Sequence, residues 1–258
     1  MNDAAAIPLA AMTALQALRR YKGSLSGKTV FIPAGLSGTG SFACQLAKNV
    51  FGAGKVITTV STSKVPKVPA LLGEGVVDQV IDYTTTNLAA AIPPKSVDFM
   101  FDTTGQSMEC LSRMVPETGL IISIATTPSG TQMQSSPELG DVPFVVSAVL
   151  DALDSVRRWR ARRWKVQYEY LFLKPNSQDL DELRTHVDDG KVKSVVGLTV
   201  PLKDIELVKK AAMTSYQGKG GIGKTVFTMT ADGKMDGIVT VSIAKYGFTS
   251  SRHRFRIS

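Results

Sequence analysis

Short β-branched runs alternate with segments of helical spacing along most of the chain. The runs Thr29–Ile32 and Lys55–Val60 have the residue types of buried parallel strands. Between them, apolar residues recur at i, i+3, i+4 and i+7, which predicts a helix that packs one face on a sheet. These residues are Ala43, Leu46, Ala47 and Val50. The order strand, helix, strand predicts a right-handed βαβ unit.

The same pattern continues beyond this unit. Further strands are predicted at residues 76–83, 97–101, 119–125, 166–173, 194–200 and 224–229. Helices are predicted at residues 10–21, over positions 145–156, and at residues 179–188 and 203–216. Strands separated by helical segments predict an α/β fold with a doubly wound parallel sheet. Ligands of such sheets bind at the carboxyl ends of the strands, which predicts one rim with Ser61, Tyr83 and residues 102–105 and 125–127.

A glycine-rich turn connects the first predicted strand to the helix that follows it. Gly35, Gly38 and Gly40 have no Cβ, so the backbone can turn sharply there and approach a ligand closely. A strand that leads through glycines into a helix N-terminus suits a pyrophosphate, because free N–H groups and the positive end of the helix dipole coincide. A glycine cluster alone is a weak signal, and the predicted βαβ context strengthens it.

The loop after the second strand is where a dinucleotide fold selects its cofactor. An NAD site usually places Asp or Glu there to bind the ribose 2′-hydroxyl. This chain has hydroxyl residues and Lys64 there, with Lys67 nearby, and no acidic residue in residues 41–73. Such a loop suits the 2′-phosphate of NADP(H). The alternative is a polar loop that contacts no ligand.

Charge and cysteine content narrow the functional classes. The net charge of +8 comes largely from a basic stretch at residues 157–165 and from the C-terminal run. The basic stretch fits the C-terminal end of a helix, where cations complement the dipole, better than a nucleic-acid patch, although Trp159 and Trp164 lie within it. Cys44 and Cys110 are too few for a disulfide framework or a zinc cage, so we expect no metal and a reduced, cytoplasmic location. No stretch has the length of a membrane span.

A second glycine-rich segment competes with the first. Residues 218–225, GKGGIGKT, match the Walker A pattern of P-loop nucleoside triphosphatases. A P-loop follows a strand and opens a helix, whereas this segment follows a predicted helix and precedes a predicted strand. We therefore interpret it as a basic, hairpin-like connection into the last strand, and nucleotide hydrolysis is the less favoured alternative.

Seven segments together resemble a known family. They are AAAIPLAAMTALQAL, AGLSGTGSFACQLAK, VITTVSTSK, VDQVIDY, DFMFDTTG, DDGKVKSVVGLTVPL and GKTVFTM. In this order they resemble the zinc-independent quinone oxidoreductase and enoyl reductase branch of the medium-chain dehydrogenase/reductases, over about residues 4–230. The resemblance implies NADPH-dependent reduction of an activated carbon–carbon double bond or a quinone, a small-molecule substrate, and a homodimer.

The resemblance also assigns cofactor-binding residues by motif position. Ser37, Gly38, Thr39 and Gly40 would hold the pyrophosphate, with Ser37 where many relatives have a glycine. Ser61, Lys64 and Tyr83 would surround the 2′-phosphate. Thr103 and Thr104 would lie by the ribose, and the backbone near Ala125 and Phe172 by the nicotinamide. No side chain is identified as the catalytic acid, and Asp102 is interpreted as a structural acid at a strand end.

The family pattern begins with a GroES-like catalytic domain, and this chain starts at the interdomain helix. The resemblance therefore divides the chain into an interdomain helix (1–27), a Rossmann NAD(P)-binding domain (28–173), a remnant that returns to the catalytic domain (174–230) and an unassigned tail (231–258). Because the GroES-like part shapes the substrate pocket, the alternative function is a catalytically inactive NADP-binding module.

Overall fold

The protein is described here from a computed structural model, in which residues 1–135, 142–216, 221–229 and 238–239 are described. The strands are β1 (Thr29–Ile32), β2 (Lys55–Val60), β3 (Gln79–Asp82), β4 (Phe99–Asp102), β5 (Leu120–Ser123), β6 (Gln167–Tyr170), β7 (Val196–Pro201), β8 (Lys224–Thr228) and β9 (Ile238–Val239). The α-helices are α1 (Asn2–Ala6), α2 (Pro8–Leu18), α3 (Gly40–Gln45), α4 (Lys67–Leu72), α5 (Leu88–Ala91), α6 (Gly130–Gln134), α7 (Phe144–Arg163), α8 (Ser177–Asp188) and α9 (Ile205–Tyr216). Short 3-10 turns are η2 (Thr62–Lys64), η3 (Ser107–Glu109) and η4 (Leu111–Arg113), and the π-helical turn η1 (Leu46–Val50) continues α3.

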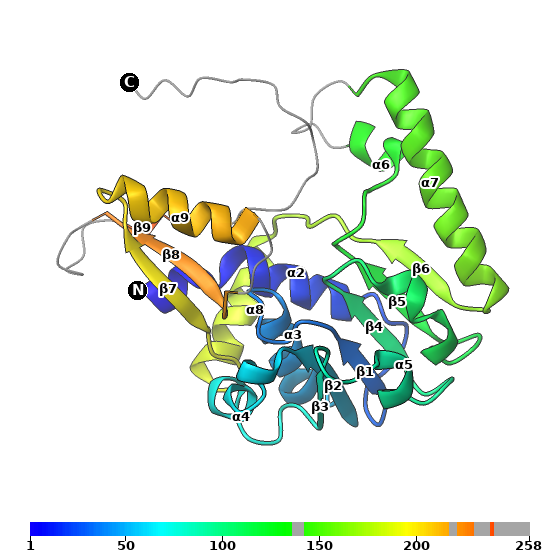
Figure 1. Ribbon diagram of the computed structural model, residues 1–258, viewed down its shortest axis with the longest axis horizontal. Helices are drawn as coiled ribbons and strands as arrows, with labels where there is room; N and C mark the ends of the chain where they lie inside the picture. Colours follow the sequence, from blue (N-terminus) through cyan, green and yellow to red (C-terminus); the bar gives the residue numbers. More distant parts are fainter. Residues whose placement is uncertain (136–141, 217–220, 230–237, 240–258) are drawn as a thin grey trace.

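Within the described residues, six strands form one parallel sheet in the order β3-β2-β1-β4-β5-β6. The chain order reverses on either side of β1, so β1 and β4 flank the switch point where ligands of doubly wound sheets bind. The predicted α/β fold with a doubly wound Rossmann-type sheet is therefore confirmed (Figure 1).

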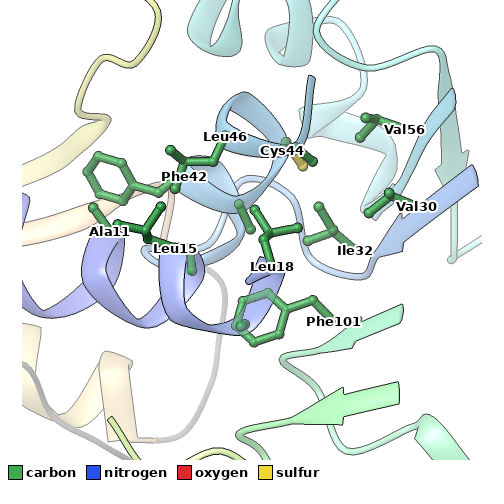
Figure 2. Close-up of a cluster of buried hydrophobic side chains, with 14 of the residues drawn as sticks. Ala11, Leu15, Leu18, Val30, Ile32, Phe42, Cys44, Leu46, Val56 and Phe101 are labelled. Carbon is green, nitrogen blue, oxygen red and sulfur yellow. The ribbon is translucent and has the colours of Figure 1, made fainter. Parts of the chain in front are cut away.

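Alternate residues of the central strands enter two separate cores, as expected for a sheet that is covered on both faces. Val30 and Ile32 of β1 pack with α2 and α3 on one face, whereas Phe31 packs on the other. Figure 2 shows the first core, where Leu15 of α2 lies beside Phe42 of α3 and Leu18 belongs to the same cluster. The N-terminal helix thus belongs to the same core as the glycine-rich unit.

The predicted elements are confirmed with changes at their ends. The bounds of β1 and β2 match the prediction, whereas β3, β5 and β6 are shorter than predicted. The N-terminal helix was predicted to start at residue 10, but α2 already begins at Pro8 and α1 precedes it. Proline is favourable in the first helical turn, where its missing N–H has no partner to lose.

A second, three-stranded sheet has the order β7-β8-β9, and α9 lies along it (Figure 1). The strands β7 and β8 are parallel and α9 connects them. The predicted hairpin-like connection at residues 218–225 falls partly outside the described residues, because residues 218–220 are not among them, and it stays a prediction. Of the tail at residues 231–258, only Ile238–Val239 is described, and it pairs with β8 in antiparallel orientation. The division into four segments stays a prediction.

Both cysteines are free, buried and distant from water. Burial raises the pKa of the Cys44 thiol and of the Cys110 thiol to about 12. At pH 8, about one thiol in ten thousand would then be ionised, and the thiolate is the reactive form. We expect Ellman's reagent to leave both thiols unmodified in the native protein and to modify both in guanidinium chloride. Rapid labelling of the native protein would contradict this burial.

Candidate functional site

The glycine-rich loop between β1 and α3 is held by its own hydrogen bonds. The Ser37 N–H donates to the Ala34 carbonyl at 2.8 Å, and the Gly40 N–H donates to Ser37 Oγ at 3.0 Å. Ala34 has a positive φ of 53°, which is unusual for a residue with a Cβ. Within the described residues, the N–H groups of Gly38 and Thr39 donate no hydrogen bond. The loop therefore presents two free donors at its tip.

A segment from far along the sequence crosses this loop. The Gly223 N–H donates to the Leu36 carbonyl at 2.8 Å, and Gly223 forms a parallel bridge with Ser37. We call residues 221–224 the strap. A Cβ built on Gly38 would lie 2.6 Å from Cδ of Lys224, so the lysine stem lies directly against that glycine. The described part of the Walker-like segment is therefore in contact with the glycine-rich loop.

The residues predicted to surround the 2′-phosphate follow two adjacent strands. Ser61 follows β2, Tyr83 follows β3, and the Tyr83 N–H donates to the Val60 carbonyl at 3.1 Å. Lys64 lies in the turn after Ser61, and its ammonium donates to the Gly221 carbonyl of the strap at 3.2 Å. Burial and the nearby Lys67 lower the pKa of Lys64. The structure therefore brings Ser61 and Tyr83 to one end of the rim, where Lys64 contacts the strap.

Asp82 is a residue of this corner that the sequence analysis missed. Its carboxylate accepts hydrogen bonds from the Thr84 N–H at 2.9 Å and from Thr84 Oγ1 at 2.7 Å. Hydrogen bonds from Thr62 and Thr84 lower the pKa of Asp82 to about 2, so the carboxylate is charged at neutral pH. The feature that could have identified Asp82 is its position at the end of β3, beside the end of β2.

At the centre of the rim, Asp102 organises the loop after β4. Its side chain is 0% exposed and accepts hydrogen bonds from backbone N–H groups of that loop. The interpretation of Asp102 as a structural acid is confirmed. Thr103 Oγ1 donates to the Pro33 carbonyl at 2.8 Å, which ties this loop to the glycine-rich loop. The Thr104 hydroxyl lies 3.5 Å from Asp102 Oδ1. The role of both threonines at a ribose stays a prediction.

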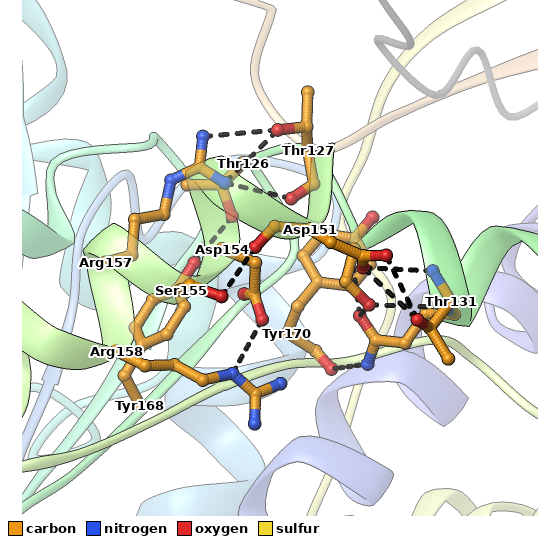
Figure 3. A network of polar contacts seen from close by, with 12 residues as sticks. Thr126, Thr127, Thr131, Asp151, Asp154, Ser155, Arg157, Arg158, Tyr168 and Tyr170 are labelled. Atoms are coloured by element: carbon orange, nitrogen blue, oxygen red, sulfur yellow. Dashed lines mark hydrogen bonds and ion pairs between the residues drawn. The ribbon is translucent and has the colours of Figure 1, made fainter. Parts of the chain in front are cut away.

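Ala125 and Phe172 follow β5 and β6 at the other end of the rim. The Phe172 ring packs edge-on against Tyr170, with 5.4 Å between ring centroids. Figure 3 shows the polar network that fixes this end: Thr126 Oγ1 and the Tyr168 hydroxyl are 2.7 Å apart, and Arg157 of α7 donates to Thr127. Burial raises the pKa of Tyr168. The contact between Arg157 and Thr127 therefore joins the loop after β5 to α7.

Comparison with known proteins assigns the family. The family model of zinc-binding dehydrogenases matches residues 77–227. The chain belongs to this family. The resemblance to the quinone oxidoreductase and enoyl reductase members of the medium-chain dehydrogenase/reductases is confirmed by its relatives. The chain is 37% identical over 196 residues to a chloroplastic NADPH-dependent alkenal/one oxidoreductase from Arabidopsis thaliana. It is 38% identical over 130 residues to a 2-methylene-furan-3-one reductase from Solanum lycopersicum.

The chain aligns with only part of each relative. The alignments cover 75% of the chain and 39% of the Arabidopsis protein, and 50% of the chain and 31% of the tomato protein. Among solved structures, a quinone oxidoreductase from Coxiella burnetii superposes with a TM-score of 0.65 at 26% identity, covering 86% of this chain and 59% of that one. The chain therefore spans less than two thirds of these relatives.

Two further findings concern metals and membranes. In the described ranges, no group of three or more His, Cys, Asp or Glu side chains is placed to hold a metal ion. None of the helices in the part of the chain that the structure describes has the length and apolar content that a bilayer crossing requires.

Proposed function

We propose that this chain carries the cofactor site of an NADPH-dependent oxidoreductase that reduces an activated carbon–carbon double bond, as in an enone or enoyl group, or a quinone. The printed names of the Arabidopsis, tomato and Coxiella relatives support this reaction class. The cofactor would supply the hydride from C4 of its nicotinamide, and the protein would bind and orient it. An NADP-binding module without turnover is the second candidate.

The observation that carries the proposal is the pair of free N–H groups at Gly38 and Thr39, at the switch point of the sheet. Two adjacent free backbone donors suit the oxygen atoms of a diphosphate. Gly38 and Gly40 have no side chain, so a cofactor can approach the backbone of the loop closely. Ser37, Gly38, Thr39 and Gly40 would bind the pyrophosphate.

The remaining residues would then order the cofactor along the rim. Ser61, Lys64 and Tyr83 would bind the adenosine 2′-phosphate at the ends of β2 and β3. Thr103 and Thr104 would lie near the ribose after β4. The backbone at Ala125 and Phe172 would border the nicotinamide after β5 and β6. The strand order supports this direction of the dinucleotide, since its two halves would lie on opposite sides of β1.

Zinc independence, a homodimer and a cytoplasmic location belong to the same proposal. The lack of a cluster of metal-ligating side chains in the described residues supports catalysis without zinc at this rim. Exposed apolar side chains on α7, including Phe144 and Val149, support association with a second copy, which light scattering would test. The free thiols Cys44 and Cys110 agree with a reducing compartment, which fractionation of cells would test.

Lys64→Ala tests the cofactor assignment. We expect NADPH to bind about tenfold more weakly, with NADH binding changed much less, because only NADPH carries the 2′-phosphate that the ammonium would contact. Quenching or enhancement of nicotinamide fluorescence on titration measures both affinities. Lys209→Ala is the matched control, since Lys209 is exposed on α9 and pairs with Glu206. Equal losses for both dinucleotides would refute the 2′-phosphate role.

Turnover and ATP titration separate the alternative functions. The proposed oxidoreductase oxidises NADPH in the presence of an enone or quinone, which absorbance at the nicotinamide band follows. Binding of NADPH without oxidation, across both substrate classes, would favour the inactive module. Tight magnesium-dependent binding of ATP in place of NADPH would overturn both in favour of a P-loop hydrolase.

A further inference from the structure

We propose that Ser123 and Tyr168 are positioning residues for the nicotinamide half of the cofactor, because they fix the loop after β5 (residues 124–127) through Thr126. This inference rests on the proposed function, in which the backbone of that loop borders the nicotinamide. It deepens that function, since it names side chains that would act on the cofactor through the loop and not by direct contact.

Ser123 joins the loop after β5 to the loop after β4. Asp102 and Ser123 are paired residues at the ends of these strands, and the Ser123 hydroxyl donates to Asp102 Oδ2 at 3.1 Å. Ser123 is 0% exposed, so water does not compete for this bond. The other carboxylate oxygen accepts from the Gly105 N–H at 2.7 Å, and a Cβ on Gly105 would lie 3.7 Å from the Ala125 carbonyl oxygen. One carboxylate therefore anchors two loops that lie against each other.

The hydroxyl groups of this region form a chain with one direction, because each hydroxyl has a single proton to donate. The Ser123 proton is used on Asp102, so Ser123 Oγ is left as an acceptor. It accepts from the Thr126 hydroxyl at 3.3 Å and from the Ala125 N–H at 3.4 Å. The Thr126 proton is then used as well, so Tyr168 is the donor in the 2.7 Å contact between the two hydroxyls. Burial raises the pKa of Tyr168, which keeps this donor protonated at neutral pH.

This chain of hydroxyls holds the loop after β5 from its inner side. Thr126 is half-buried and its hydroxyl meets that of Tyr168, whereas Ala125 and Thr127 are exposed (Figure 3). Arg157 adds a second attachment, because it donates to the Thr127 carbonyl at 3.1 Å. The outer side of the loop is thus left for the nicotinamide. Hydride transfer depends on placement to within about 1 Å, so a loop held in this way would orient the reacting ring.

Tyr168→Phe and Thr126→Val in the full chain test this role, because each removes a hydroxyl and keeps the shape of the side chain. We expect NADPH to bind about threefold more weakly to Tyr168→Phe and roughly tenfold more weakly to Thr126→Val, the range of one and two neutral hydrogen bonds. Adenosine 2′,5′-bisphosphate lacks the nicotinamide half and should bind both variants within about twofold of the wild type.

Two further variants serve as conservative replacement and control. Thr126→Ser keeps the hydroxyl and should bind NADPH within about twofold of the wild type. Thr185→Val removes a hydroxyl that bonds the Asp181 carbonyl within α8, so it should leave the binding of both ligands unchanged. Combining Tyr168→Phe with Thr126→Val should cost no more affinity than Thr126→Val alone, because both changes remove the same bond.

The emission spectrum of bound NADPH provides a second readout, which a loss of stability alone would not move. At saturating cofactor, the spectrum with Thr126→Val should shift toward that of free NADPH, and the spectrum with Thr185→Val should match the wild type. Unchanged NADPH affinity in both Tyr168→Phe and Thr126→Val would overturn the inference while the proposed function stands. An equal loss for adenosine 2′,5′-bisphosphate, or an equal loss in Thr126→Ser, would also overturn it. If the wild type does not bind NADPH, the proposed function fails first and the inference fails with it.

Discussion

Replacing Asp102 by alanine is expected to lower the free energy of unfolding by about 4 kcal/mol. The carboxylate is fully buried and accepts hydrogen bonds from four backbone N–H groups, from the Ser123 hydroxyl and, at 3.5 Å, from the Thr104 hydroxyl, so its removal leaves several donors without a partner in a site that water does not reach. The donors are the N–H groups of Thr104 at 3.1 Å, Gly105 at 2.7 Å, Gln106 at 3.2 Å and Ser107 at 3.3 Å, and the Ser123 hydroxyl at 3.1 Å. Each unsatisfied buried donor costs about 1 to 3 kcal/mol, partly relieved by relaxation of the loop.

Urea unfolding measures this loss, and two variants calibrate it. Asp102→Asn keeps one side-chain acceptor, so its cost should lie between those of the wild type and the alanine variant. Asp188→Ala removes the exposed partner of Arg184 and should cost no more than about 0.5 kcal/mol, as is usual for surface ion pairs. If Asp102→Ala unfolds at the same urea concentration as Asp188→Ala, the loop after β4 does not depend on this carboxylate.

The sequence was sufficient for the parts of the fold in which one local signal dominates. The strands β1 and β2 are fully predicted because β-branched residues and the flanking glycines agree about their ends. Gly35 and Gly40 were identified for their conformational freedom. The structure adds the physical reason, since a Cβ on Gly35 would lie 2.2 Å from Thr58 Oγ1. Local pattern and tertiary packing point to the same residues here.

The features that the sequence could not supply depend on segments far apart in the chain. The helix α7 was predicted from Val145, Val149 and Val156, yet these side chains are 71%, 54% and 54% exposed. Helical periodicity thus predicted the element but not which surface covers its apolar face. The contact between Gly38 and Lys224 joins positions that no local pattern relates. Asp82 escaped attention because its relevance comes from the pairing of β3 with β2.

Replacing Gly40 by alanine is expected to lower the free energy of unfolding by about 3 kcal/mol, the upper part of the range for overpacking a buried site. A Cβ at Gly40 would lie 2.3 Å from the Ala34 carbonyl oxygen and 2.9 Å from Ser37 Oγ. The first of these atoms is backbone, and Ala34 already has a positive φ, so the loop cannot yield without losing its turn. Because the same loop presents the Gly38 and Thr39 N–H groups, NADPH affinity should fall by at least about tenfold.

Gly38→Ala is the comparison that separates crowding of the backbone from crowding of a side chain. Its Cβ would meet Cδ of Lys224, which belongs to a flexible side chain. The free energy of unfolding should therefore change by less than about 1 kcal/mol. Affinity for NADPH and NADH should nevertheless fall, because the added methyl group lies beside the Gly38 and Thr39 N–H groups that would bind the diphosphate. Thermal or urea unfolding and fluorescence titration of both variants measure the two effects. A Gly40→Ala protein as stable as Gly38→Ala would mean that the turn at Ala34 is free to move, and the rigid loop on which the diphosphate site depends would have to be abandoned.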